Sequence, residues 1–246
     1  MEREKILSVS DLSVAFGKRS IIHGLSFDLY AGDDLAVLGP NGSGKTVLLK
    51  ALLGLVPFEG EIRWAPKVRQ GYVPQTVAAD RQMPLNIHDL LVAKANFLKL
   101  PASDVAAVIQ TAGLNADLLS SSIGVISGGQ FQKALIAFAL LGNPSVLLFD
   151  EPTASLDELA EEHVYELVAQ LREKGLTVIL VSHDISLVHR SASQVLCLSK
   201  DHSCMGPPQE VLTSKMLEQL YGAEPKYYLH RHDHGSVQPS SSSGAK

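Results

Sequence analysis

Long apolar runs are missing from this sequence of 246 residues, whose longest apolar stretch extends only from Ala134 to Leu141. A helix that spans a bilayer needs roughly 18 or more consecutive apolar residues, so no membrane span is expected. Cysteines are also scarce, and two isolated thiols, Cys197 and Cys204, favour a reducing cytosol over a disulfide scaffold. Basic residues are fewer than acidic ones, since the sequence has 21 Lys and Arg against 26 Asp and Glu. The resulting net charge of −5 argues against nucleic acid as a partner.

An apolar share of 46% is enough for a folded core, and the spacing of the apolar residues predicts an α/β fold. A first group of short strands is followed by a mainly helical block over about 87–141, which Pro101, Gly113 and Gly124 interrupt. Ser103 is a candidate cap for one of these helices. Further helices are expected over 46–53 and 157–173, and strands over 6–16, 21–30, 34–38, 61–64, 68–73, 146–149, 177–181 and 195–198.

A glycine-rich loop joins the strand over 34–38 to the helix over 46–53. It matches the pattern G-x-x-x-x-G-K-[ST], in which backbone amides turn inward around phosphate oxygens at a helix N-terminus. Lys45 offers a full positive charge to the β- and γ-phosphates, and Thr46 offers a hydroxyl to Mg²⁺. A plain turn between strand and helix is the alternative. The loop consists of Gly39, Pro40, Asn41, Gly42, Ser43, Gly44, Lys45 and Thr46.

Two carboxylates end the apolar strand over 146–149. Phosphoryl transfer needs one group for the metal and another for the nucleophile, and Asp150 and Glu151 suit these roles in that order. An acidic pair that caps a helix is the alternative. His183 follows the next buried strand, where it could hydrogen-bond the transferred phosphoryl group, although a loop histidine of no special role has the same signature.

A second candidate phosphate-binding end lies where a helix begins near 127. A serine hydroxyl, glycine amides and the helix dipole are suited to an anion there, and a simple serine cap with a Gly-Gly turn is the alternative. One nucleotide does not need two such ends from one chain, so a second chain could complete a composite site. The residues are Ser127, Gly128, Gly129 and Gln130.

Together these motifs resemble the nucleotide-binding subunits of ATP-binding cassette (ABC) transporters, and they occur in that family's order over residues 4–222. The resemblance implies that Phe16 stacks on adenine, that Gln75 reaches the metal and the attacking water, and that His183 is the switch histidine. It also implies a D-loop at Ser155-Leu156-Asp157, with Asp157 among the catalytic residues. In the family's terms, 39–46 is the Walker A loop, 127–130 belongs to the signature, and Asp150 and Glu151 complete Walker B.

The signature region departs from the family pattern in three places. Ile126 stands where the family has Leu, which is a mild apolar exchange. Lys133 and Phe138 stand where the family usually has arginines. Lysine keeps the charge without the planar fork, whereas phenylalanine removes the charge. These exchanges concern the fine contacts of the signature helix rather than ATP hydrolysis.

The resemblance implies a P-loop NTPase fold of the ABC ATPase type. Its RecA-like core sheet would carry an N-terminal antiparallel β subdomain and a helical subdomain inserted at about 78–145. The implied cofactors are ATP and Mg²⁺, and the working unit is a homodimer that sandwiches two ATP molecules. The other implied partners are integral-membrane permease subunits, which would contact about 78–100, and indirectly a periplasmic or extracellular metal-binding protein. The chain would therefore work at the cytoplasmic face of the membrane.

The C-terminal region is similar to that of metal-ion importer ATPases, and of zinc-uptake ATPases in particular. A tail over 223–246 carries His230, His232 and His234, and alternating imidazoles suit Zn²⁺. A solvated extension without a role is the alternative. Cys197 and Cys204 could join a metal site, but they lie around an expected strand pair, which favours packing or surface positions for both thiols. Two other functions stay open: the ATPase of a manganese, iron or siderophore importer, and an ABC ATPase outside transport.

Overall fold

The computed structural model describes residues 3–75, 85–153, 156–199 and 203–221. An antiparallel sheet opens the chain and contains β1 (Lys5–Phe16), β2 (Arg19–Tyr30) and β4 (Glu59–Trp64) in the order β2-β1-β4. The hairpin between β1 and β2 has a two-residue loop that needs a positive φ at its first position. Gly17 supplies it with a φ of 60°. The antiparallel N-terminal sheet is thereby confirmed.

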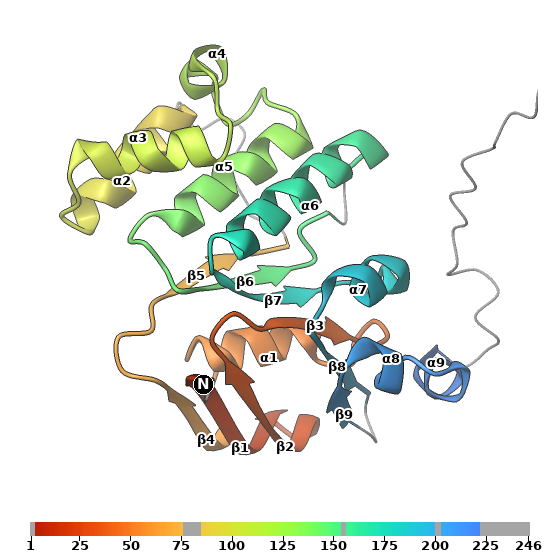
Figure 1. Ribbon diagram of the computed structural model, residues 1–246. Coiled ribbons are helices and arrows are strands. Elements are labelled where there is room, and N and C mark those ends of the chain that lie inside the picture. Colours follow the sequence, from red (N-terminus) through yellow and green to blue (C-terminus); the bar gives the residue numbers. More distant parts are fainter. Residues whose placement is uncertain (1–2, 76–84, 154–155, 200–202, 222–246) are drawn as a thin grey trace, which may run out of the picture.

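A six-stranded sheet forms the centre of the molecule (Figure 1). Its order is β5-β6-β7-β3-β8-β9, and all neighbours are parallel except the last pair, which is antiparallel. The strands expected here are confirmed, including the strand pair around Cys197 and Cys204. No bounds were predicted for its second strand, β9, which is short and only partly buried. The strands are β3 (Asp34–Leu38), β5 (Gln70–Val73), β6 (Val146–Asp150), β7 (Thr177–Val181), β8 (Gln194–Leu198) and β9 (Ser203–Gly206).

The helices between β5 and β6 gather above the six-stranded sheet, whereas α1 lies below it (Figure 1). The expectation that Ser103 caps a helix is wrong. Pro101 already has the extended geometry of a cap, so the helix begins at Ala102. In the described part of the chain, no helix is both long and apolar enough to span a membrane. The helices are α1 (Lys45–Leu52), α2 (Ile87–Phe97), α3 (Ala102–Thr111), α4 (Ala116–Ser120), α5 (Gly128–Leu140), α6 (Glu158–Glu173), α7 (Ile185–Ser191), α8 (Pro208–Val211) and α9 (Ser214–Tyr221).

The core has two layers, one on each face of the six-stranded sheet. Alternate residues of a strand point to opposite faces. Val146 and Leu148 of β6 therefore pack with α1 and the antiparallel sheet, and Leu147 and Phe149 pack with helices α2 to α6. Burial on both faces explains why this strand is a continuous apolar run rather than an alternating one. It also fixes where the strand ends, and so where its terminal carboxylates lie.

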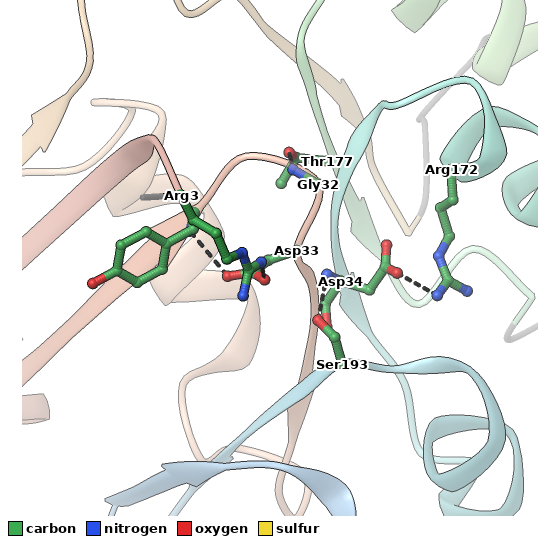
Figure 2. Close-up of polar contacts among 8 residues, drawn as sticks. Arg3, Gly32, Asp33, Asp34, Arg172, Thr177 and Ser193 are labelled. Carbon is green, nitrogen blue, oxygen red and sulfur yellow. Dashed lines mark hydrogen bonds and ion pairs between the residues drawn. The ribbon is translucent and has the colours of Figure 1, made fainter. Parts of the chain in front are cut away.

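Polar contacts hold the amino-terminal ends of β3 and β7, at the end of the sheet away from the carboxylates (Figure 2). The Gly32 amide donates to the Thr177 hydroxyl over 2.9 Å, and the Asp34 amide donates to Ser193 over 2.9 Å. Asp34 also forms an ion pair with Arg172 of α6. Burial raises the pKa of Asp34, while Arg172 opposes that shift. These contacts hold the turn before β3 against β7, α6 and the segment before β8. They therefore fix the position of the strand that leads into the phosphate loop.

Replacing Thr177 with valine should lower the free energy of unfolding by about 1 kcal/mol, since the part-buried hydrogen bond between the exposed Gly32 and the buried Thr177 is lost. Valine keeps the shape of the side chain, so packing changes little. Urea unfolding measures the loss. Thr177→Ser is the matched control, because it keeps the hydroxyl and should retain most of the stability. Equal losses in the two variants would show that packing, rather than this hydrogen bond, is responsible.

Candidate functional site

The phosphate loop runs from the end of β3 into the first turn of α1. Gly44 precedes the helix with a φ of 103°, a conformation that glycine adopts without steric cost. Gly39 is required for a different reason. A Cβ there would lie 2.1 Å from the carbonyl oxygen of Leu198 and 2.7 Å from the Ser43 hydroxyl. The loop is therefore packed tightly against the end of β8.

Lys45 lies across this loop rather than extending into solvent, and only 6% of its surface is exposed. Its Nζ donates to the carbonyl oxygen of Gly39 over 2.8 Å and to that of Pro40 over 3.3 Å. The same Nζ lies 3.5 Å from Oε1 of Glu151. A buried ammonium group thus links the phosphate loop to the acidic end of β6.

The first carboxylate at that end, Asp150, is almost fully buried. It accepts a hydrogen bond from the Thr46 hydroxyl over 2.9 Å and another from the Tyr72 hydroxyl over 3.3 Å. Burial raises the pKa of Asp150, and these two bonds oppose the shift. Burial and the nearby carboxylate raise the pKa of Tyr72 to about 12, so the phenol stays protonated and donates.

The second carboxylate, Glu151, has a strained backbone. Its φ is 47°, which is uncommon for a residue other than glycine and occurs most often where function requires it. Its amide donates to the carbonyl oxygen of Val181 over 3.2 Å, which fixes this conformation. Its Oε2 accepts from Nε2 of Gln75 over 2.9 Å. The structure thus joins Lys45, Gln75 and Glu151, residues from three distant parts of the sequence, in one cluster.

The other predicted site residues occupy more exposed positions. His183 follows β7, whose Val181 pairs with Asp150, so it leaves the sheet at the same edge as the carboxylates. Phe16 ends β1 with 48% of its surface exposed, as a ring that stacks on a ligand requires. Asp157 caps α6 through a 2.8 Å bond from the Ala160 amide. That contact gives Asp157 a structural role, and its catalytic role stays a prediction. Ser155 lies outside the described residues.

The signature residues begin α5 with a reciprocal cap. The Ser127 hydroxyl accepts from the Gln130 amide over 3.3 Å, and Oε1 of Gln130 accepts from the Ser127 amide over 2.9 Å. Gly129 lets α6 approach, because a Cβ there would lie 2.7 Å from that of Ala160. The six-stranded sheet separates α5 from α1 (Figure 1), so the structure does not bring this helix end to the phosphate loop. A phosphate-binding role for it requires a second copy.

Phe138, one of the two positions where the family usually has arginine, connects two helices. Nζ of Lys94 in α2 lies 4.3 Å from the centre of the Phe138 ring and donates to the Phe138 carbonyl oxygen. Burial lowers the pKa of Lys94. An arginine at position 138 would place a second positive charge beside Lys94, whereas phenylalanine offers the face of a π-system to the ammonium. Lys133, the other of these positions, is partly buried on α5.

Sequence reasoning missed a hydroxyl network beneath the carboxylates. The Thr153 hydroxyl donates to Oε1 of Glu161 over 2.9 Å and lies 3.0 Å from the Tyr165 hydroxyl. Tyr165 is also hydrogen-bonded to Ser182, and burial raises its pKa to about 12. The network therefore joins the segment after Glu151 to the residue before His183. Tyr72 was missed as well, since nothing in its spacing marks a tyrosine that faces a carboxylate.

Replacing Tyr165 with phenylalanine should lower the kcat of ATP hydrolysis by roughly 3- to 10-fold and leave KM for ATP nearly unchanged. The ring keeps its packing, but the loops after β6 and β7 lose their shared hydroxyl partner. Steady-state ATPase kinetics and thermal unfolding are measured together. A lower melting temperature with an unchanged kcat would restrict this tyrosine to a structural role.

The three tail histidines, His230, His232 and His234, lie outside the described residues, as does the whole predicted tail over 223–246. Their predicted affinity for zinc therefore stays a prediction. Within the described part of the chain, no three His, Cys, Asp or Glu side chains gather as a metal-binding group.

Comparison with known proteins shows the family to which the chain is similar. A family model described as ABC transporter matches residues 22–154. The zinc import ATP-binding protein ZnuC of Hydrogenovibrio crunogenus is 34% identical over 95% of each chain. The protein of the same name from Yersinia pestis is 35% identical over 93% of this chain and 91% of its own.

Two solved structures are also similar. One, described as a metal-chelate type ABC transporter in an inward-facing conformation, is 29% identical, covers 90% of each chain and has a TM-score of 0.82. The ADP conformation of an ATP-binding cassette has a TM-score of 0.76 over 89% of this chain and 99% of its own, and at 20% identity it supports the fold alone. The expected fold class, a P-loop fold of the ABC ATPase type, is confirmed. The chain belongs to the ABC transporter family, as an ATP-hydrolysing subunit.

Proposed function

We propose that this chain couples ATP hydrolysis to the import of a divalent metal ion, and that the ion is zinc. The cluster of Lys45, Asp150 and Glu151 at the end of β6 is the observation that carries the ATPase function. The choice of zinc is supported by relatives named zinc import ATP-binding proteins, which match along nearly the whole chain.

The described residues fit a bound nucleotide. The buried Ser43 hydroxyl inside the loop has no hydrogen-bond partner among the described residues, and the loop leads into a helix N-terminus. Lys45 contributes the charge that binds the β- and γ-phosphates. Glu151 takes up the proton of the attacking water, and Gln75 orients that carboxylate through the bond to its Oε2.

Mg²⁺ also fits the donors at this site. Thr46, Asp150 and Gln75 offer hydroxyl, carboxylate and amide oxygens, which are the hard ligands that this ion prefers. Because Gln75 donates through Nε2, its Oε1 is available as an acceptor. When bound, the ion neutralises charge on the phosphates. Thr46 and the protonated Tyr72 hold the Asp150 carboxylate in position to bind the ion.

The proposed working unit is a head-to-tail pair of chains. The helix end at 127–130 lies across the sheet from its own phosphate loop, so it is available to the loop of a second copy. Gly128 and Gly129 begin that helix without side chains, which leaves their own amides open to an anion, while the Gln130 amide donates to Ser127. Each ATP would then lie between the loop of one chain and the signature of the other.

The proposed location is the cytoplasmic face of a membrane, with permease subunits as partners that supply the path for the ion. A periplasmic or extracellular metal-binding protein would deliver the ion from the other side. Import of manganese, iron or a siderophore is the alternative function, since the nucleotide site is the same for every cargo.

Reconstitution with the permease in vesicles tests the cargo. We expect zinc-loaded capture protein to stimulate ATP hydrolysis and zinc uptake, whereas manganese- and iron-loaded preparations do not. Glu151→Gln provides the control, because uptake that persists in this variant does not depend on the ATPase. Stimulation by manganese or iron alone would reject zinc and retain the ATPase assignment.

A further inference from the structure

Three sulfur-bearing side chains lie at the outer edge of the six-stranded sheet, on β8, β9 and α9. Cys197 of β8 and Cys204 of β9 lie directly opposite each other in an antiparallel pair. Residues so paired point to the same face of a sheet, with Cβ atoms about 4.5–5.5 Å apart. On that face the two cysteines belong to the cluster that α8 and α9 cover.

The third sulfur comes from α9. Sδ of Met216 lies 3.8 Å from Sγ of Cys204. With metal–sulfur bonds of about 2.3 Å, the length of a zinc–thiolate bond, two sulfur ligands on one ion lie about 3.8 Å apart at a tetrahedral angle and about 4.0 Å apart at a trigonal angle. The observed separation therefore suits two ligands of a common cation. The opposed cysteine places a third sulfur on the same side.

The type of ligand determines the type of cation. Thiolate sulfurs bind both copper(I) and zinc, but zinc in proteins takes cysteine, histidine and carboxylate ligands, so the thioether of Met216 favours copper(I); oxygen donors select magnesium or calcium. Cys197 is 1% exposed, which favours a cation that binds without water ligands, and Cys204 on the edge strand β9 is partly exposed and gives access. We propose that Cys197, Cys204 and Met216 form a binding site for a soft monovalent cation of the copper(I) type.

Binding involves no electron transfer. Each thiol that becomes a ligand releases its proton to solvent as the sulfur–metal bond forms, and the thioether of Met216 binds through a lone pair. A disulfide between the two cysteines is the competing fate of this pair; both cysteines are free in the structure, and forming the bond needs an oxidant. The cation would link α9 to the strands β8 and β9, so binding should raise the thermal stability of the chain.

Silver(I), a redox-inert substitute for copper(I), provides the test. Reduced full-length chain carrying His230→Ala, His232→Ala and His234→Ala is titrated without oxygen against a competing chelator, so that tail imidazoles do not contribute. We expect one silver ion per chain, a higher Tm, and sulfur neighbours alone in X-ray absorption spectra.

Two variants decide whether these sulfurs are the ligands. Cys204→Ser should abolish the one-to-one complex, and Met216→Leu should weaken it at least tenfold and leave two sulfur neighbours. Both positions are less buried than Cys197, so both variants should fold, which circular dichroism checks. Unchanged silver affinity in Cys204→Ser would overturn the proposal. The absence of a one-to-one complex in the parent chain would also overturn it. Neither result depends on ATP hydrolysis or on zinc import.

Discussion

Replacing Glu151 with glutamine should reduce the rate of ATP hydrolysis by about 10²- to 10⁴-fold while ATP still binds. Glutamine keeps the length of the side chain and can still accept a hydrogen bond from Gln75, but it cannot take a proton from water. The phosphate loop and Lys45 are unchanged, so nucleotide affinity should be retained. ATP turnover measured beside equilibrium ATP binding separates the two effects.

The same variant should accumulate as an ATP-bound dimer if two chains share each nucleotide. Light scattering with and without ATP measures this, and the dimer should persist far longer than that of the unmodified chain. Glu162→Gln makes the same chemical change on an exposed position of α6 and should alter neither property. Undiminished turnover in Glu151→Gln would reject the assignment of this residue as the base.

Gly39→Ala should impair both stability and ATP binding, because the new methyl group would lie 2.1 Å from the Leu198 carbonyl oxygen. That oxygen belongs to the backbone at the end of β8 and cannot move alone. Overpacking of this kind costs about 1–3 kcal/mol in unfolding free energy. The displaced loop would also move the carbonyl group that holds Lys45. We expect ATP affinity to fall at least about tenfold, which corresponds to about 1.4 kcal/mol.

Gly175→Ala is the control for general destabilisation. Gly175 ends α6 with a φ of 87° and has open space around a Cβ, so alanine there costs roughly 1–2 kcal/mol of backbone strain. It lies away from the phosphate loop and should leave ATP affinity unchanged. Isothermal titration and urea unfolding on both variants separate loop geometry from stability. Normal ATP binding by Gly39→Ala would contradict the tight packing of the loop.

The sequence predicted those parts of the structure that depend on local patterns. Continuous apolar runs identified β6 and β7, because a strand buried on both faces has few polar positions. The motif at 39–46 identified the phosphate loop, because a strand before it and a helix after it are required for that geometry. The carboxylates Asp150 and Glu151 followed from the end of such a strand.

The rest depends on contacts between distant segments, which one sequence does not encode locally. Tyr72 and Asp150 are 78 positions apart, and the Tyr165 network joins helix α6 to the loops after β6 and β7. The bounds of β9 were not predicted because its pairing with β8, rather than its own pattern, stabilises it. Asp157 shows a further difficulty, since a residue predicted to be catalytic is also the cap of a helix.

Complementation between two inactive chains tests the central claim, that each ATP is hydrolysed between two copies. Lys45→Ala removes the charge of the phosphate loop. Gly128→Asp places a carboxylate at the exposed start of α5, where it suits the helix dipole but repels a phosphate. In a mixed pair, one composite site has both an intact loop and an intact signature. If each ATP lies between two copies, the mixture hydrolyses ATP faster than either variant alone. A rate no higher than the mean of the two separate chains would show that the two copies do not share a site.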